Sequence, residues 1–432
     1  MARILRRLVA SSCLLAALAA ATGAAADGPV RAFTGARVFD GTGRTLENAT
    51  LVVKDGRIAS VGAGVSVPAG AERIELDGRF VMPGLVNAHG HVGATRGLRS
   101  GPDLYTRQNV LDQLRLYARY GVTTVVSLGD DREEGFRVRD EQETASLDRA
   151  RLYVAGAVVD ATTPEAARAQ VAALAALEPD WVKIRVDDTL GTTAKMTPAV
   201  YRAVIDEAHK RGLRVAAHLF YLEDARDLVA AGVDLIAHSV RDAAVDASFV
   251  SELADRGTCL CPTLMREVSA FAYAEEPAFF ADPFFLREAD PAVVAELRSP
   301  ERRERVRASP ASARYREALR TASRNLKTLV NGGVPIAFGT DTGPPARFQG
   351  YFEHEELARM VEAGLTPTQA LVAATSGAAR CLGLKSVGRL EPQAWADFLV
   401  LGADPLTDIR NTKRLESVWI AGNRVPARDA HP

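Results

Sequence analysis

The sequence has few cysteines, histidines and aromatic residues, and it has almost no net charge. Its 432 residues include 4 cysteines, 7 histidines and 6% aromatics, and 53 basic residues balance 54 acidic ones. No basic run stands out, so we expect no nucleic-acid partner, because binding nucleic acid needs a concentrated positive surface. Hydrophobic residues, at 47%, supply a large core.

The sequence has a single long apolar run, at its N-terminus. Three arginines and an apolar stretch over residues 8–20 precede small residues at 24–26. This order is typical of a secretory signal peptide, which we expect to span residues 1–26. An uncleaved anchor is the alternative, but a spanning helix needs about 20 apolar residues. We therefore expect a periplasmic or secreted protein that has no membrane contact after cleavage.

The mature chain would keep Cys259, Cys261 and Cys381. This odd, small number predicts no disulfide framework. Cys259 and Cys261 are two apart in "TCLCPTL", a segment typical of a strand, so we expect both to be small buried hydrophobes on one face.

The pattern divides the mature chain into a central domain and two flanking pieces. Residues 27–82 and 386–432 have short β-branched segments around Asp-Gly and Gly turns, and we expect them to form one small β-sandwich domain. Residues 83–385 alternate strands with helices, which begin at Thr-Pro pairs. The prediction is an α/β fold, a (β/α)8 TIM-type barrel, with a doubly wound open sheet as the alternative.

Residues 265–334 connect two predicted strands and are far longer than an ordinary loop. Such an insertion could cover a site as a lid, or its aromatic residues could pack its own helices or a subunit contact. Those residues are Phe271, Tyr273, Phe279, Phe280, Phe284 and Phe285.

Histidines gather at the ends of predicted strands. His89 and His91 in "NAHGH" share one side of an extended strand, so both can reach one ion. His218, His238 and Asp341 end three further strands, and in a barrel these ends form the active face. This set predicts a metal site. We do not expect the other three histidines to bind the metal. His209 lies on the solvated side of a helix, His354 is more typical of the surface than of the site, and His431 is in the tail.

Lys183 lies in the apolar strand "DWVKIRV". Burial would lower its pKa and leave a neutral amine. Such an amine can take up carbon dioxide as a carbamate, an anionic ligand with two oxygens that can bridge two cations.

Several motifs together resemble the amidohydrolase superfamily, in its imidazolonepropionase-like and prolidase-like branch. "VMPGLVNAHGH", "WVKIRV", "RVAAHLF", "GVDLIAHSV" and "PIAFGTDTG" are similar to its metal motifs, and "GLTPTQALVAATSGAARCLGL" to its C-terminal signature. The resemblance implies one metal on His89, His91 and Asp341 and a second on His218 and His238. Carboxylated Lys183 and a hydroxide would bridge them, with zinc as the usual ion.

Three functions stay open. The first is a dinuclear dipeptidase, carboxypeptidase or N-acyl amino acid amidase, in which Asp341 moves the proton and Lys183 and His238 hold the ions. The second is a mononuclear imidazolone or cyclic amide hydrolase or a deaminase. Deaminase relatives commonly have Glu where Tyr221 stands. The third is an inactive binding paralogue.

The substrate would be a small molecule, and the oligomeric state stays open, with a homo-oligomer as one option. Arg185, Tyr221 and Arg347 are candidate substrate contacts, although Arg185 could instead pair with Asp187 or Asp188. Peptidase relatives often place Tyr where this chain has Phe220, which puts recognition of a dipeptide carboxylate by that residue in doubt.

Overall fold

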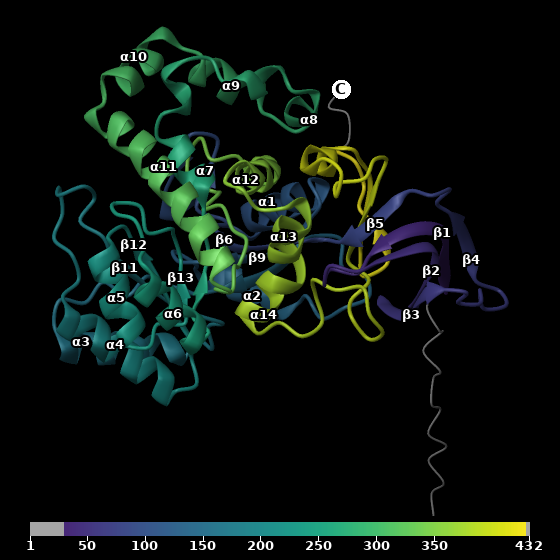
Figure 1. Cartoon of the computed structure of the whole chain (residues 1–432), viewed down its shortest axis with the longest axis horizontal. Helices are drawn as coiled ribbons and strands as arrows, with labels where there is room; N and C mark the ends of the chain where they lie inside the picture. The colour runs from purple at the N-terminus through teal and green to yellow at the C-terminus, as the bar shows by residue number, and fades with distance from the viewer. Residues whose placement is uncertain (1–29, 429–432) are drawn as a thin grey trace, which may run out of the picture.

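The computed structural model describes residues 30–428 and has mixed α/β architecture (Figure 1). The predicted signal peptide, residues 1–26, and His431 lie outside the described residues. Within residues 30–428, no helix is both long enough and apolar enough to cross a membrane.

The central strands are parallel and pair in two sets, β10-β9-β6 and β11-β12-β13-β14. Isolated parallel bridges extend these pairings, from Val159 to Ile184 and from Leu260 to Ile336. A third bridge, from Thr342 to Gly90, returns to β6, so the pairings run round to the strand where they began. The strands are β6 (Leu85–Gly90), β9 (Val122–Ser127), β10 (Arg151–Val154), β11 (Val182–Val186), β12 (Val215–Leu219), β13 (Leu235–Ile236) and β14 (Cys259–Leu260).

The predicted eighth strand, residues 335–341, is held only by single bridges and backbone hydrogen bonds. Phe338 accepts from the Ala88 amide at 2.8 Å, and the Ala337 amide donates to Leu260 at 2.8 Å. Gly339 makes this close approach feasible, because a Cβ there would lie 2.8 Å from the His89 nitrogen. Asp341 follows with a φ of 59°, so the chain turns out of the strand direction at the residue that faces the histidines.

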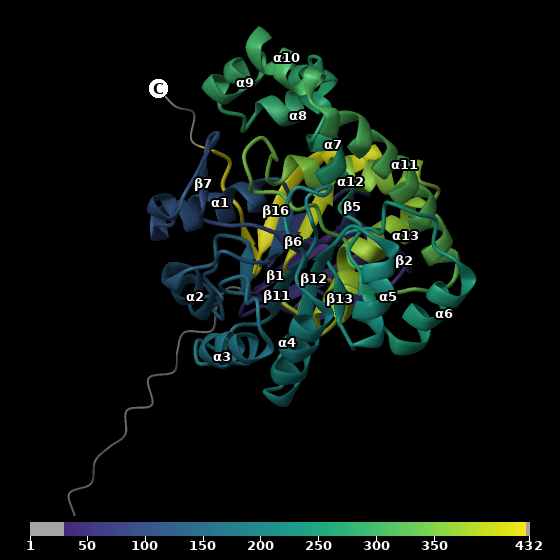
Figure 2. The same ribbon diagram turned by 90° about the vertical axis from the view of Figure 1, so that its left-hand side faces the viewer.

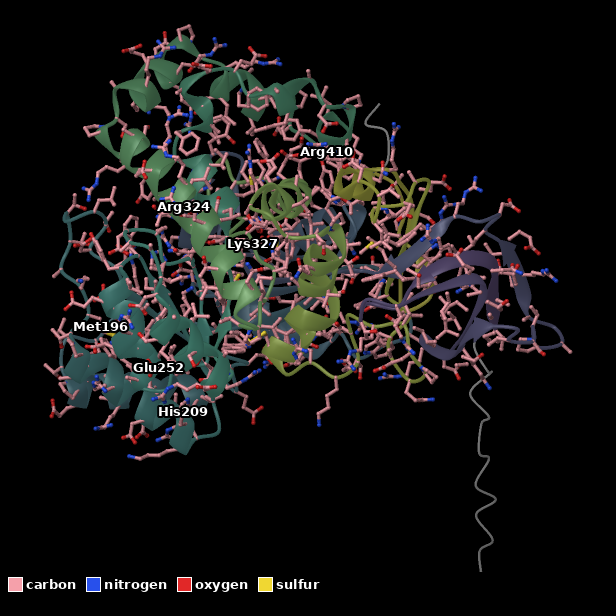
Figure 3. All side chains as sticks on the ribbon, in the orientation of Figure 1. Met196, His209, Glu252, Arg324, Lys327 and Arg410 are labelled. Atoms are coloured by element: carbon pink, nitrogen blue, oxygen red, sulfur yellow. A yellow bond between two sulfur atoms is a disulfide. The ribbon has the colours of Figure 1, made fainter. Side chains whose placement is uncertain are left out.

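Helices follow the strands and cover them, and the predicted Thr-Pro starts are where they begin. Thr163 caps α3, and Thr366 forms a capping box with Gln369 at the start of α13. His209 lies on α4 at the edge of the molecule, as predicted, with its side chain 41% exposed and paired with Asp234 (Figure 3). The helices are α1 (Arg107–Arg119), α2 (Glu133–Asp140), α3 (Pro164–Ala175), α4 (Pro198–Lys210), α5 (Leu222–Ala230), α6 (Ala247–Arg256), α12 (Tyr351–Glu362), α13 (Pro367–Val372) and α14 (Ala378–Leu382).

Strands from both chain ends pair in one mixed sheet, in the order β17-β16-β15-β5-β1-β2-β3, with β4 on β1 (Figure 1). Phe33, Phe398 and Trp419 form its aromatic core. A buried ion pair of 2.7 Å between Arg151 on β10 and Asp397 ties this sheet to the central strands. The strands are β1 (Arg31–Phe39), β2 (Thr45–Lys54), β3 (Arg57–Ala63), β4 (Glu72–Glu75), β5 (Phe80–Pro83), β15 (Phe398–Leu401), β16 (Leu415–Ile420) and β17 (Asn423–Arg424).

The long insertion is helical and lies above α12 (Figures 1 and 2). Its aromatic residues pack mainly on one another and on α12: Phe279 lies 5.1 Å from Phe285 and 5.5 Å from Tyr351, measured between ring centroids. The aromatic side chains therefore pack the insertion's own helices, which is one of the alternatives that the sequence predicted for them. Its elements are α7 (Leu264–Ser269), α8 (Pro283–Leu286), α9 (Pro291–Leu297), α10 (Pro300–Ala308) and α11 (Pro310–Asn331).

Two sequence expectations are wrong. Cys259 forms a disulfide with Cys381, a residue 122 positions away on α14, and among the cysteines of residues 30–428 only Cys261 is a free buried thiol. Spacing along the chain could not reveal this pair, because the fold alone brings α14 beside β14. His354 is also not on the surface: its imidazole is buried between Thr412 Oγ1, at 2.9 Å, and the Tyr120 carbonyl, at 2.7 Å.

Candidate metal centre

His89, His91 and Asp341 meet where β6 and the segment after Gly339 end. Asp341 Oδ1 lies 3.0 Å from His91 Nε2 and 3.5 Å from His89 Nε2. One ligand atom from each residue lies within 4.8 Å of the others. His89 Nδ1 lies 2.7 Å from the Ala237 carbonyl, which fixes the ring so that Nε2 faces the carboxylate.

His218 and His238 stand next to this group. Their ring centroids are 4.2 Å apart, and the His238 ring lies 4.7 Å from that of His89. His238 Nδ1 lies 2.6 Å from Thr263 Oγ1, while its buried Nε2 has no hydrogen-bond partner. A buried nitrogen without a partner is costly, and a ligand would satisfy it.

Lys183 projects from β11 into the same space. Its Nζ lies 3.3 Å from His89 Nε2, and the side chain is buried. The structure therefore brings together all six residues that the sequence predicted as metal ligands.

The protonation states suit cation binding. Burial holds the pKa of His89 and of His238 well below the ordinary range, and it lowers the pKa of His218 to about 3, so the imidazoles are neutral. Burial likewise lowers the pKa of Lys183 to about 8. Burial opposes ionisation of Asp341, but Arg347, His89 and His91 keep its pKa well below the usual value. Neutral imidazoles with an ionised carboxylate are the forms that bind a metal.

These donors fit a divalent cation. Imidazole nitrogens and a carboxylate suit zinc and its first-row neighbours, and the His238 ring, whose Nε2 has no partner, lies against the rings of His89 and His218.

Comparison with known proteins matches residues 80–425 to the amidohydrolase family. The chain belongs to the amidohydrolase family. An uncharacterized protein of Mycobacterium tuberculosis is 29% identical over 371 residues, which cover 82% of this chain and 86% of that protein. The imidazolonepropionase of Salinispora arenicola is 26% identical over 414 residues, covering 86% of this chain and 90% of the relative.

A solved structure of a putative prolidase from Bifidobacterium longum is similar to this amidohydrolase. It has a TM-score of 0.72 and 26% identity, and the match covers 92% of this chain and 94% of that one.

The three predicted substrate contacts differ in their surroundings. Arg347 Nη1 forms an ion pair with Asp341 Oδ2 at 2.5 Å, directly at the centre of this amidohydrolase. The Tyr221 hydroxyl donates to Asp188 at 2.9 Å. The exposed Arg185 donates to Thr189 Oγ1 at 2.7 Å, and the structure of residues 30–428 records this contact and no ion pair with Asp187 or Asp188.

The sequence analysis missed residues that orient the histidines. Asp187 Oδ2 lies 2.7 Å from His218 Nε2, with only 2% of its side chain exposed. Thr263, with a φ of 49°, holds His238, and the Asn87 side chain accepts from the His89 amide at 2.9 Å. Asp187 lies four positions after Lys183 and directly follows β11, and this place at a strand end was the one signal that pointed to it.

Proposed function

We propose that this chain is a metal-dependent amidohydrolase that cleaves an amide or peptide-type C–N bond with two divalent cations, most simply zinc. One observation carries the proposal: six donor side chains from five strands converge in one space, with His89 and His91 both supplied by β6. Relatives named imidazolonepropionase and prolidase support C–N bond hydrolysis. We also propose that the ring of parallel pairings is the predicted (β/α)8 barrel and that the sheet made from both chain ends is the small β domain.

His89, His91 and Asp341 would hold one cation, and His218 and His238 the other. When bound, the cations would supply an activated water and polarise the scissile carbonyl. Asp341 is the group placed to move a proton, since its carboxylate is ionised and lies between the imidazoles and Arg347. It would accept the proton of the attacking water and pass it to the leaving nitrogen. Arg347 must loosen its ion pair for that transfer, because the pair opposes protonation of Asp341.

Lys183 would carry a carbamate derived from carbon dioxide and bridge the two ions. Its burial and lowered pKa keep part of the amine neutral near neutral pH, and the neutral amine is the form that reacts with carbon dioxide. A carbamate there would also remove the cost of burying an ammonium group beside an imidazole.

A mononuclear hydrolase of cyclic amides, or a deaminase, is the second candidate. The tight grouping of His89, His91 and Asp341 favours it, because these three alone can hold one ion. Lys183 would then have no ligand role.

We propose that the protein is exported through the signal sequence expected at residues 1–26. The disulfide between Cys259 and Cys381 supports this location, because disulfides persist in oxidising compartments.

The test is a hydrolysis screen with zinc-reconstituted protein, paired with elemental analysis of metal per chain. N-acyl amino acids, dipeptides and cyclic amides form the panel. We expect turnover of one class with two zinc ions per chain. One ion per fully active chain would reject the dinuclear scheme, and no hydrolysis of any amide by metal-loaded protein would favour an inactive paralogue.

A further inference from the structure

A cavity of about 520 Å³ lies at the amino ends of the central strands. Arg214, Asp234 and Thr258 line it, and they directly precede β12, β13 and β14. His218 and His238 lie toward the carboxyl ends of β12 and β13. The cavity is therefore on the opposite face of the strands from the candidate metal centre, and its role is separate from that of the centre.

Both cysteines of the disulfide line this cavity. Cys259 and Cys381 are 6% and 7% exposed, whereas the free Cys261 is 0% exposed and does not line the cavity. Exposed residues form part of the wall: Arg380 is exposed, and the side chain of Arg256 is 46% exposed. A small molecule can therefore enter from solvent and approach the disulfide.

The charges around this cavity leave a surplus of one positive charge. Three guanidinium groups line it, those of Arg214, Arg256 and Arg380, together with the carboxylate of Asp234. Arg256 pairs with Glu252 at 3.1 Å, and Asp234 acts on Arg214. Three guanidinium groups thus face two carboxylates, so an anion is attracted into the cavity and a cation is not.

Two of these arginines place the positive charge beside one cysteine. Arg214 Nη1 donates to the Cys381 carbonyl at 2.8 Å, and its Nη2 donates to the Leu382 carbonyl. The Arg214 guanidinium also lies 4.1 Å from the centroid of the Trp181 ring, which holds it in this position. Arg380 directly precedes Cys381 in the chain. An anion between these two guanidinium groups lies next to Cys381.

We infer that the disulfide between Cys259 and Cys381 is a reversible modification site for small thiols that carry carboxylates. The carboxylates of the thiol bind at Arg214 and Arg380, and its sulfur reaches Cys381. This inference does not rest on the proposed function, because the cavity and the metal centre lie on opposite faces.

The exchange is balanced without an added oxidant. The lone pair of the incoming thiolate forms a new bond to Cys381 Sγ, the bond between the two Sγ atoms breaks, and Cys259 leaves as a thiolate that takes a proton from water. The product is a mixed disulfide on Cys381. Attack by the Cys259 thiolate on Cys381 Sγ reverses the step and releases the small thiol. With an oxidised small thiol, the same steps in reverse order form the bond in a chain that begins reduced.

The test compares three thiols on the folded, full-length protein. Reduced glutathione carries carboxylates, 2-mercaptoethanol is neutral and cysteamine is cationic. Alkylation of the released thiols, followed by mass spectrometry, gives the rate at which the disulfide opens, and each rate is divided by the thiolate concentration. We expect glutathione to exceed 2-mercaptoethanol by about 2- to 5-fold, the size of one charge contact in a solvated site, and cysteamine to be the slowest.

The preference for glutathione should also fall as salt is added, because salt screens charges in an open cavity. Equal rates per thiolate for the three thiols would overturn the inference. Opening of the disulfide only where urea unfolds the chain would overturn it as well, because the cavity would then give no access to the bond.

Arg380→Glu should abolish the preference for glutathione, since it turns the surplus positive charge into a negative one. Arg410→Glu is the matched control, because Arg410 is also exposed, pairs with Asp408 at 3.7 Å and does not line the cavity. A preference that persists in Arg380→Glu as it does in Arg410→Glu would overturn the inference.

Two further variants test which sulfur is attacked. Cys259→Ser and Cys381→Ser each leave one thiol of the pair, and both lose the same disulfide, so their loss of stability is matched. With oxidised glutathione, Cys381 in the first variant should form a mixed disulfide faster than Cys259 in the second, and the buried Cys261 should stay unmodified in both. Equal rates, or a faster reaction at Cys259, would overturn the assignment to Cys381. If neither variant folds, the rates of the wild-type protein and of Arg380→Glu decide.

Discussion

Asp187→Asn should weaken metal binding without unfolding the protein. Asp187 Oδ2 lies 2.7 Å from His218 Nε2, and the two side chains are 2% and 14% exposed. A carboxylate at this position fixes which imidazole nitrogen faces the cation and makes that nitrogen more basic. Asn keeps the shape and one acceptor but removes the charge.

The expected loss of metal affinity follows from the burial of the Asp187–His218 pair. Solvent screens the pair little, so losing the charge should lower affinity for the cation on His218 by about 10- to 100-fold, the range for such supporting carboxylates. That factor corresponds to about 1.4 to 2.8 kcal/mol. The other cation, on His89, His91 and Asp341, should keep its affinity.

The assay is zinc titration against a competing chelator, with circular dichroism as the check on folding. Asp234→Asn is the matched control, because Asp234 likewise pairs with a histidine, His209 at 2.9 Å, and otherwise accepts from the Val215 amide at 2.8 Å, and neither residue is a candidate ligand. If Asp187→Asn binds two zinc ions as tightly as the wild-type protein, Asp187 does not support a metal ligand and His218 is not one.

Three further predictions test separate parts of the structure. Lys183→Ala should lower kcat/KM by more than about 100-fold, which is the loss expected when a residue that only supports a metal ligand is removed. Acetate or propionate should partly restore activity. Full activity of Lys183→Ala without these acids would exclude the carbamate. Burial raises the pKa of Glu353 to about 7, so the folded protein holds that proton and loses stability as pH rises from about 4.3 to 7. Glu353→Gln keeps the oxygen that accepts from Asn87 but has no group that titrates, so its stability should not fall over this pH range. Between pH 5 and pH 8, urea titrations should therefore show its free energy of unfolding rising by about 3 kcal/mol relative to that of the wild-type protein. If the difference in free energy of unfolding is the same at both pH values, the pKa of Glu353 is not raised. Reducing the bond between Cys259 and Cys381, which are 122 residues apart, should cost about 4 to 5 kcal/mol of stability, and an unchanged melting temperature under reductant would contradict this.

The sequence predicted the parts of the fold that depend on local pattern. Apolar runs predicted the central strands, and Thr-Pro pairs predicted the starts of α3, α4 and α13, because both signals act within a few residues. The convergence of His89, His91 and Asp341 was also predictable, since strand ends meet at one face.

Other features depend on contacts between distant segments. His354 lies in an ordinary helix pattern, and it is buried by contacts with Tyr120, Thr412 and Phe284, which are distant in the sequence. The partner of Cys259 could not be predicted for the same reason. Arg214 carried no motif, and its place beside the disulfide becomes visible only when α14 lies beside β14.

The most direct test of the metal centre is an anomalous diffraction map of crystals grown with zinc. The account predicts two peaks, one between His89, His91 and Asp341 and one between His218 and His238, with extra density on Lys183 Nζ joining them. Peaks away from these imidazoles, or an unmodified Lys183 turned from both ions, would contradict it.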